Sequence, residues 1–269
     1  MDKVRVLVNG LRFPEGPTVD KTGCVWCVEQ EGEGLFCRDR EGSTMRVHTG
    51  GRPGGTVIHD DYLWFSDSGQ HAIRRMNIET KAIDTVFDTL YGQPLNGPNE
   101  LLFDKQGNLI FTCPGPSERE DTGYMGVYSA NGMAEIIADG LSYPKGLAFF
   151  PTDQTLLLAE THRQRIWQGF WDGSGLSWET IRVWSELGEN TKNLPFPSPN
   201  GMAVGPDKNL YVTLFGAGLV RVLSPDGAVV RDIALPGKNP TNCTFDLSGE
   251  LGLIVTESER GELLSITSS

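Results

Sequence analysis

The chain has 269 residues, 38% of them hydrophobic and 22% charged, and its formal net charge at pH 7 is −12. This acidic excess argues against a nucleic acid as the main partner, because binding to phosphates needs a basic face. No apolar run approaches the roughly 20 residues of a membrane-spanning helix, and the first residues lack the apolar segment of a secretory signal. We therefore expect a cytoplasmic protein that acts on a small molecule and binds no membrane. The sequence leaves open whether it forms a homodimer.

Five cysteines are scattered along the chain, an odd number that suits a reducing cytoplasm. Cys24 and Cys27 have the C-x-x-C spacing of redox and zinc sites. They fall in a strand-like run without a second pair or a histidine cluster, and residues three apart in a strand face opposite sides. We expect buried thiols rather than a functional pair.

Short apolar alternations separated by turn residues predict an all-β protein. The first run, residues 4–8, precedes six units of about 45 residues. In chain order, the strand–turn–strand segments of these units cover residues 18–26, 57–65, 100–112, 146–158, 202–213 and 243–256. Six such units predict a six-bladed β-propeller that occupies residues 1–269 as a single domain, with residues 4–8 pairing in the last blade to close the ring. Two packed β-sandwiches are the competing architecture.

Most units open with a proline and one variable residue. The copies are Pro14-Glu15-Gly16, Pro98-Asn99-Glu100, Pro144-Lys145-Gly146, Pro199-Asn200-Gly201 and Pro240-Thr241-Asn242, with a weaker copy at Gly54-Gly55. If these are equivalent points in a closed ring, the variable residues converge on its axis: Glu15, Asn99, Lys145, Asn200 and Thr241. A carboxylate, two amides and an ammonium that meet there form a candidate site.

Propeller geometry assigns further residues to the same face. The loops that return to it cover residues 29–34, 67–71, 113–124, 160–163, 214–218 and 257–261. His162 is the best general acid or base among them, because its ordinary pKa lies near neutrality, and His71 follows a similar argument. The alternative for each is a loop histidine that bonds backbone carbonyls. His59 falls in a turn on the opposite face.

Several other residues are candidates for contact with substrate. Glu118 and Arg119 lie in the longest loop, and Phe215 lies at the mouth beside Gly216. A charge cluster in a loop is otherwise a solvated surface, and an aromatic ring is otherwise blade packing. Glu100 is either the base that activates water or a structural carboxylate that accepts backbone N–H groups.

The sequence resembles the gluconolactonase/senescence-marker (regucalcin-like) family of six-bladed propellers. The motifs that carry the resemblance are Phe13-Pro-Glu-Gly-Pro17, Gly97-Pro-Asn-Glu-Leu101, Ala159-Glu-Thr-His162, Pro199-Asn-Gly-Met-Ala203 and Leu210-Tyr-Val212. The resemblance covers residues 13–266 and implies a lactone hydrolase with one divalent metal on the propeller axis.

The resemblance also implies which residues would hold the metal, and two of three differ here. Glu15 matches the first ligand, and Asn99 matches an asparagine that contacts metal-bound water or substrate. Lys145 replaces a ligand asparagine and Asn200 replaces a ligand aspartate. A calcium, zinc or manganese ion bound by Glu15, Asn99 and Asn200 would require Lys145 to be displaced, because an ammonium has no lone pair and repels a cation. Otherwise Lys145 takes the position of the metal and no metal is bound.

The first interpretation is therefore a hydrolase of lactones or related cyclic esters, in which water attacks the ring carbonyl and a metal or Lys145 stabilises the oxyanion. Glu15, Asn99, Lys145 and His162 are its candidate catalytic residues. Asn200, Glu100, His71, Glu118, Arg119 and Phe215 are its candidate substrate contacts. Two alternatives stay open: a lysine-dependent lyase or decarboxylase that forms a Schiff base on Lys145, and a non-catalytic binding propeller.

Overall fold

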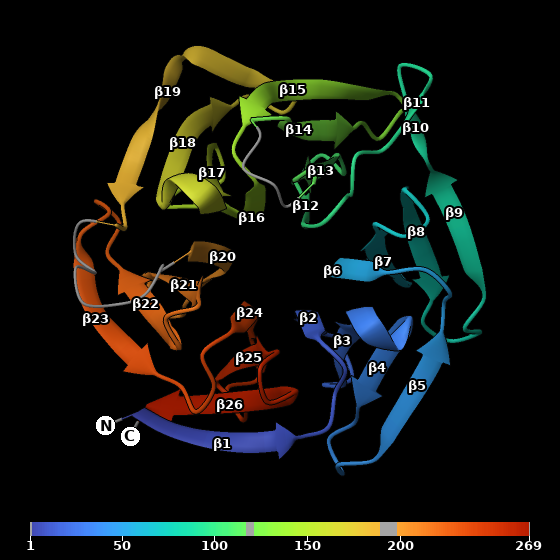
Figure 1. The fold of residues 1–269 in the computed structure, drawn as a ribbon, viewed down its shortest axis with the longest axis vertical. Coiled ribbons are helices and arrows are strands. Elements are labelled where there is room, and N and C mark those ends of the chain that lie inside the picture. Colours follow the sequence, from blue (N-terminus) through green and yellow to red (C-terminus); the bar gives the residue numbers. More distant parts are fainter. Residues whose placement is uncertain (1, 117–120, 189–197, 269) are drawn as a thin grey trace.

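The structure is a computed structural model that describes residues 2–116, 121–188 and 198–268. Six four-stranded antiparallel sheets are arranged as blades around a central axis (Figure 1). The predicted six-bladed β-propeller is confirmed, and the alternative of two packed sandwiches is wrong. Within the described residues, helical structure is limited to two 3-10 turns, η1 (Gln30–Gly32) and η2 (Thr161–Arg163).

The strands of each blade run from the axis to the outer edge. The innermost strands are β2 (Pro14–Val19), β6 (Pro53–His59), β12 (Leu101–Phe103), β16 (Pro144–Phe149), β20 (Ser198–Val204) and β24 (Pro240–Phe245). The second strands are β3 (Val25–Glu29), β7 (Tyr62–Asp67), β13 (Leu109–Cys113), β17 (Thr155–Glu160), β21 (Leu210–Phe215) and β25 (Leu253–Glu257). The third strands are β4 (Gly34–Arg38), β8 (Ala72–Asn77), β14 (Gly123–Tyr128), β18 (Arg165–Trp171), β22 (Leu219–Leu223) and β26 (Glu262–Ser268). The outer strands are β5 (Thr44–His48), β9 (Ile83–Phe87), β15 (Ala134–Leu141), β19 (Leu176–Glu186), β23 (Val229–Ala234) and β1 (Asp2–Val8). A small ribbon, β10 (Thr89–Leu90) with β11 (Gln93–Pro94), follows the second blade.

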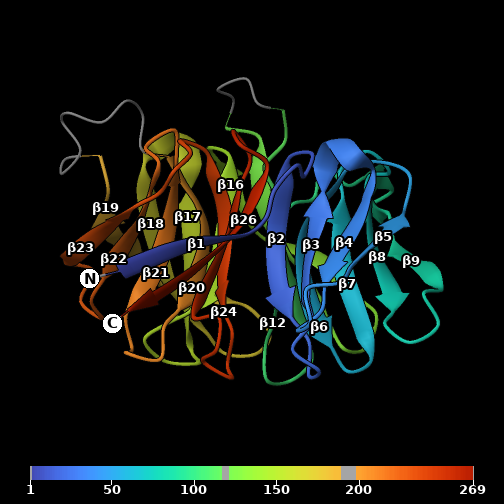
Figure 2. The same ribbon diagram turned by 90° about the horizontal axis from the view of Figure 1, so that it is seen from below.

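The ring is closed by its first strand. β1 pairs antiparallel with β26, with Val4 opposite Ile266, so the first and last segments of the chain share the sixth blade (Figures 1 and 2). The predicted pairing of residues 4–8 in the last blade is confirmed. This closure gives the first and sixth blades the same kind of neighbours as the other four.

Apolar side chains fill the six junctions between neighbouring blades. One cluster lies at each junction, and the cluster between the first and sixth blades includes Val25, Phe36, Ile254 and Leu263. The second strands are buried on both faces, which explains why they read as nearly continuous apolar runs.

A ring of hydroxyl groups links the blades close to the axis. At every junction a threonine or serine hydroxyl donates to a backbone carbonyl of the adjacent blade. The six bonds are Thr56 to Gly16, Ser66 to Asn99, Thr112 to Lys145, Thr161 to Pro199, Thr213 to Thr241 and Thr241 to Pro14, at 2.6–3.3 Å. Because they fix the backbone of the innermost strands, these bonds hold the axial residues in place.

Replacing Thr241 with Val tests this ring. The shape of the side chain is kept, but the buried Pro14 carbonyl loses its donor at 2.7 Å. We expect the free energy of unfolding to fall by about 1–3 kcal/mol, measured by urea denaturation. Thr44→Val on the exposed outer strand is the matched control and should change it by less than about 0.5 kcal/mol. Equal effects of the two substitutions would contradict a bridging role for Thr241.

Four of the five cysteines are buried as predicted, whereas Cys24 is only partly buried. All five are free, Cys27 is fully buried, and burial raises the pKa of its thiol.

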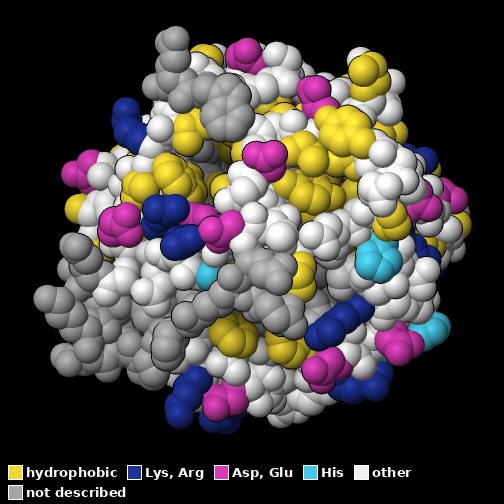
Figure 3. Space-filling view, turned by 45° about the horizontal axis from the view of Figure 1, so that its top comes forward, with side chains coloured by type: hydrophobic (Ala, Val, Ile, Leu, Met, Phe, Trp, Pro, Cys, Tyr) yellow, Lys and Arg dark blue, Asp and Glu magenta, His cyan; other side chains and the backbone are white. Residues whose placement is uncertain are grey.

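No helix of the described residues is long and apolar enough to span a bilayer. On the surface drawn in Figure 3, acidic and basic side chains are interspersed rather than gathered by sign.

Candidate active site

Three positions of the repeat build three layers around the axis. The second blade follows the same pattern as the others, because its motif is Pro53-Gly54-Gly55. The weaker copy predicted at Gly54-Gly55 therefore begins one residue earlier, at Pro53. We call the residue before each proline the rim position: Phe13, Arg52, Gly97, Tyr143, Ser198 and Asn239. The residue after it is the axial position: Glu15, Gly54, Asn99, Lys145, Asn200 and Thr241. The next residue is the inner position: Gly16, Gly55, Glu100, Gly146, Gly201 and Asn242.

A pocket of about 540 Å³ opens at the rim end of the axis. Its lining combines rim residues, axial residues and the loops predicted for this face. These are Phe13, Glu15, Gln30, Arg52, Ser68, Gly97, Pro98, Asn99, Pro114, Gly115, Tyr143, Lys145, Thr161, His162, Ser198, Asn200 and Phe215. The turn residues Asp20, Lys21 and Leu247 line a hollow at the other end, as the repeat predicted.

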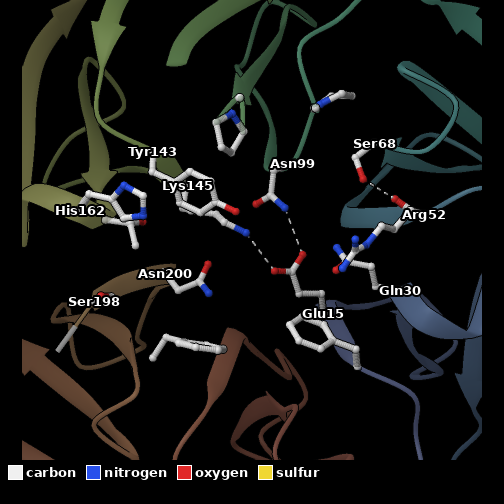
Figure 4. Close-up of a pocket in the computed structure, with 17 residues that line it drawn as sticks. Glu15, Gln30, Arg52, Ser68, Asn99, Tyr143, Lys145, His162, Ser198 and Asn200 are labelled. Atoms are coloured by element: carbon white, nitrogen blue, oxygen red, sulfur yellow. Dashed lines mark hydrogen bonds and ion pairs between the residues drawn. The ribbon is translucent and has the colours of Figure 1, made fainter. Parts of the chain in front are cut away.

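An ion pair crosses the floor of the pocket. Lys145 Nζ lies 3.2 Å from Glu15 Oε1, and the two residues come from opposite blades, the fourth and the first (Figure 4). Asn99 Nδ2 donates to the other carboxylate oxygen, Oε2, at 3.2 Å. The side chains of Lys145 and Glu15 are only 10% and 4% exposed. Both oxygens of Glu15 are therefore engaged by nitrogen donors.

The environment keeps Lys145 charged. Burial by itself opposes the ammonium, but the Glu15 carboxylate, which also accepts its hydrogen bond, outweighs burial and raises the pKa of Lys145 above its ordinary value. Lys145 Nζ also lies 5.5 Å from the centre of the Tyr143 ring, which favours a cation. The amine is thus held in the form that stabilises an anion, not in the form that attacks a carbonyl.

A second polar contact closes the axis below this pair. Asn242 Nδ2 donates to Glu100 Oε2 at 2.7 Å, and these inner residues also come from opposite blades, the sixth and the third. The other four inner positions are glycines. A Cβ at Gly201 would lie 1.8 Å from Asn242 Oδ1, and one at Gly55 would lie 2.9 Å from Glu100 Oε1. The glycines therefore leave the space that this contact occupies.

Glu100 is buried and does not line the pocket. Burial first, and then repulsion from Glu15, raise its pKa to about 7, against the hydrogen bonds from Asn242 and Leu101 N–H. Its carboxyl accepts backbone and side-chain donors, as the structural interpretation from sequence expected.

Four carboxylates near the rim hold backbone rather than substrate. Each ends the second strand of its blade and accepts the N–H of the residue one or two positions before the proline of that blade. The pairs are Glu29 with Arg12, Asp67 with Arg52, Glu160 with Ser142 and Glu257 with Asn239. Three of these carboxylates also pair with arginines, namely Arg46, Arg74 and Arg165. They fix the rim segments, and none of the four lines the pocket.

Two rim positions carry aromatic rings on strained backbone. Phe13 and Tyr143 have φ angles of 53° and 59°, in the left-handed region that β-carbons disfavour. The Tyr143 ring stacks on the His162 ring with centroids 4.6 Å apart. Phe13 and Tyr143 precede Glu15 and Lys145 by two residues in the same two blades, so the rings line the pocket nearer its rim and the ion pair lies at its floor.

Residues 13–258 match the family model described as SMP-30/Gluconolactonase/LRE-like region. The chain belongs to this family. It is 30% identical over 212 residues to a gluconolactonase of Zymomonas mobilis, covering 74% of this chain and 59% of that longer protein. It is 25% identical to diisopropyl-fluorophosphatase of Loligo vulgaris, covering 91% and 85% of the two chains. The crystal structure of a calcium-binding protein, regucalcin, from Agrobacterium tumefaciens superposes with a TM-score of 0.83 at 18% identity, covering 99% and 95%.

Most of the residues predicted from sequence meet in the pocket of this family member. Glu15, Asn99, Lys145, Asn200, His162 and Phe215 all line it. Thr241 does not, because its hydroxyl bridges to the first blade. His71 is not brought there either: its Nδ1 lies 2.9 Å from the Leu95 carbonyl oxygen, as expected of a loop histidine. Glu118 and Arg119 lie outside the described residues.

The rim residues Phe13, Arg52 and Tyr143 were missed as candidates. The signal that could have found them is their place immediately before a repeat proline. The proline marks where the innermost strand begins, as at Pro14, Pro53 and Pro144, so the residue before it lies at the mouth of the pocket. Gln30 and Ser68 were missed as well, because polar loop residues carry no pattern of their own.

The residues present do not fit a divalent cation while Lys145 is in place. A hard cation needs several oxygen ligands, with carboxylates supplying negative charge. Here the one axial carboxylate is already bonded through both oxygens, and the ammonium that bonds it would repel a metal. Among the described residues, no group of three or more His, Cys, Asp or Glu side chains is arranged to hold a metal ion.

Proposed function

We propose that this protein hydrolyses a lactone or related cyclic ester, with the Lys145 ammonium doing what a metal would do. The observation that carries the proposal is the buried, charged Lys145 at the floor of a pocket in a lactonase-family propeller. The names of its relatives, a gluconolactonase and a fluorophosphatase, support a hydrolase.

The chemistry follows from the placement of the side chains. Water attacks the ring carbonyl carbon and gives a proton to His162, and the carbonyl π electrons move to oxygen. Lys145, with the amides of Asn99 and Asn200 nearby, stabilises that oxyanion. When the intermediate collapses, the ring C–O bond breaks and the leaving oxygen takes the proton back from His162. The product is a hydroxy acid, which loses a proton to solvent at neutral pH.

Removing metal distinguishes this proposal from the metal-dependent chemistry of the family. We expect exhaustively chelated protein to hydrolyse lactones at an unchanged rate, and added calcium to have no effect. Loss of activity on chelation and its return with calcium would contradict the role of Lys145.

A matched variant makes this test sharper. The double substitution K145N/N200D removes the ammonium and adds a carboxylate, so the site then offers two carboxylates and amide oxygens to a cation. Calorimetry should detect calcium binding to this variant and not to the wild type. Calcium binding to the wild type at one ion per chain would show that Lys145 moves aside.

The observations do not favour the Schiff-base alternative, because a lysine with a raised pKa is a poor nucleophile at neutral pH. Borohydride trapping in the presence of keto acids tests it directly: a covalent adduct on Lys145 would support the lyase.

We keep the cytoplasm as the expected location, which suits five free thiols.

A further inference from the structure

The charges that line the pocket do not balance. The charged side chains in the described lining are Glu15, Arg52 and Lys145, and the lining also includes the titratable side chains of His162 and Tyr143. Glu15 and Lys145 neutralise each other at 3.2 Å. Arg52 therefore leaves an excess positive charge in the pocket of a chain whose net charge is −12.

Arg52 is held at the pocket by its backbone while its guanidinium stays available. Its N–H donates to Asp67 Oδ1 at 2.8 Å, and its carbonyl accepts from Ser68 N and Oγ, both at 3.0 Å. No carboxylate of the described residues lies within 4.0 Å of the guanidinium, because Asp67 pairs with Arg74 instead. In Figure 4 the Arg52 side chain extends beside Gln30 towards the centre of the pocket, across from Tyr143 and His162.

The rest of the pocket suits a small ring. Phe13, Phe215 and Pro114 supply apolar contact, and about 540 Å³ accommodates one ring with a short substituent. A ring whose carbonyl lies on Lys145 would direct a substituent on its far side towards Arg52 and Gln30. Guanidinium binds carboxylate through two parallel N–H bonds, which gives direction as well as attraction.

We propose that the substrate is a lactone that carries a carboxylate, and that Arg52, with Gln30, binds this carboxylate. That the ring is a lactone rests on the proposed function. That the ligand is anionic rests on Arg52 and the charges around it. Arg52 is exposed at the rim, so a neutral lactone would leave its guanidinium to water, whereas a carboxylate would give it a charge-assisted hydrogen bond.

The test compares one ring in two charge states. The probes are 5-oxotetrahydrofuran-2-carboxylate and its neutral carboxamide, and the readout is the ratio of their kcat/KM values. We expect the wild type to favour the carboxylate, and R52Q to lower this ratio by about 10- to 100-fold. R163Q is the matched control: Arg163 also lies at this face but pairs with Asp121 at 2.8 Å and does not line the pocket, so the ratio should stay at the wild-type value. A wild-type ratio near one, or an unchanged ratio in R52Q, would overturn the proposal.

A binding measurement separates this proposal from the proposed hydrolase activity. Tetrahydrofuran-2-carboxylate and its carboxamide have no lactone bond, so calorimetry reports recognition alone. If the wild type binds the carboxylate more tightly than the amide and R52Q does not, the anionic class stands even where neither lactone is turned over, in which case the hydrolase proposal fails. If both lactones are hydrolysed equally and neither ether is preferred, the hydrolase stands and the role of Arg52 is wrong.

Discussion

Lys145→Met should lower kcat/KM for the best lactone substrate by about 100- to 1,000-fold, the usual cost of losing one oxyanion-stabilising donor. Methionine keeps most of the length and volume of lysine but carries no charge. The developing oxyanion would then face the Glu15 carboxylate without the intervening ammonium. Steady-state kinetics of the purified variant gives the answer, and a rate near that of the wild type would exclude the electrostatic role.

The stability of this variant has to be measured beside its activity. Removing Lys145 leaves Glu15 buried with Asn99 as its remaining donor, which costs about 3–5 kcal/mol when a buried pair is broken. The double variant E15Q/K145M removes both charges and should regain most of that stability. Thermal unfolding curves then show whether K145M is folded at the assay temperature.

Lys145→Arg separates electrostatics from nucleophilic catalysis. Arginine keeps a positive charge at the floor of the pocket but cannot form a Schiff base. We expect its activity to lie only about tenfold below that of the wild type, because the charge is kept and its position changes. If K145R and K145M are both folded and equally inactive, the charge of Lys145 is not what catalysis uses.

The fold was predictable because each blade repeats the same local pattern. Apolar second strands such as 109–113 and 253–257 are buried on both sides, and the turns between them and the inner strands have Asp, Asn and Gly at the expected places. Residues 4–8 had no hairpin partner nearby in the sequence, so the ring itself had to supply one. These inferences use periodicity and turn chemistry, which act locally.

The axial site was predictable for the same reason, and its errors have physical causes. Counting six units places Glu15 and Lys145 on opposite blades, where their side chains reach each other. Pro53-Gly54-Gly55 was misassigned because glycine at the axial position leaves nothing for a pattern of side chains to show. Thr241 occupies an axial position but turns its hydroxyl to the Pro14 carbonyl, since a short side chain reaches the neighbouring strand before it reaches the axis.

The rim could not be read from the sequence in the same way. Glu29, Asp67, Glu160 and Glu257 look like mouth carboxylates available to a ligand, yet each is bonded to a backbone N–H before the proline of its own blade. These bonds join residues that are 15 to 18 positions apart in the sequence. Only the folded blade brings them together. The folded structure is also needed to show that Arg52 has no carboxylate partner among the described residues.

Glu100 should make the protein less stable as the pH rises from about 4.5 to about 7. Its pKa is raised from 4.5 to about 7 in the native state, first by burial and then by Glu15. Between these values the native protein keeps a proton that the unfolded chain has released, so the free energy of unfolding falls with pH. The fall amounts to about 3 kcal/mol at most, at 1.36 kcal/mol per pKa unit, and no more is lost above pH 7.

Glu100→Gln isolates this contribution from the other titrating groups. The amide oxygen can still accept from Asn242 Nδ2, and the side chain never ionises. Urea denaturation at a series of pH values should give a stability difference, variant minus wild type, that grows up to about pH 7 and is constant above it. Glu79→Gln at an exposed position should follow the wild-type curve throughout. Parallel curves for E100Q and wild type would mean that Glu100 titrates in its ordinary range.

Asn242 offers a second way to shift the pH range over which the titration of Glu100 changes the stability. Its donated hydrogen bond favours the ionised form of Glu100, so Asn242→Ala should raise the pKa of Glu100 further. The stability difference between N242A and the double variant N242A/E100Q should then extend to higher pH than the difference between wild type and E100Q. An unchanged pH range would show that the hydrogen bond from Asn242 does not stabilise the Glu100 carboxylate. A shift to higher pH would show that Asn242, on the opposite blade, helps to set the pKa of Glu100, which lies directly below the ammonium on which the proposed chemistry depends.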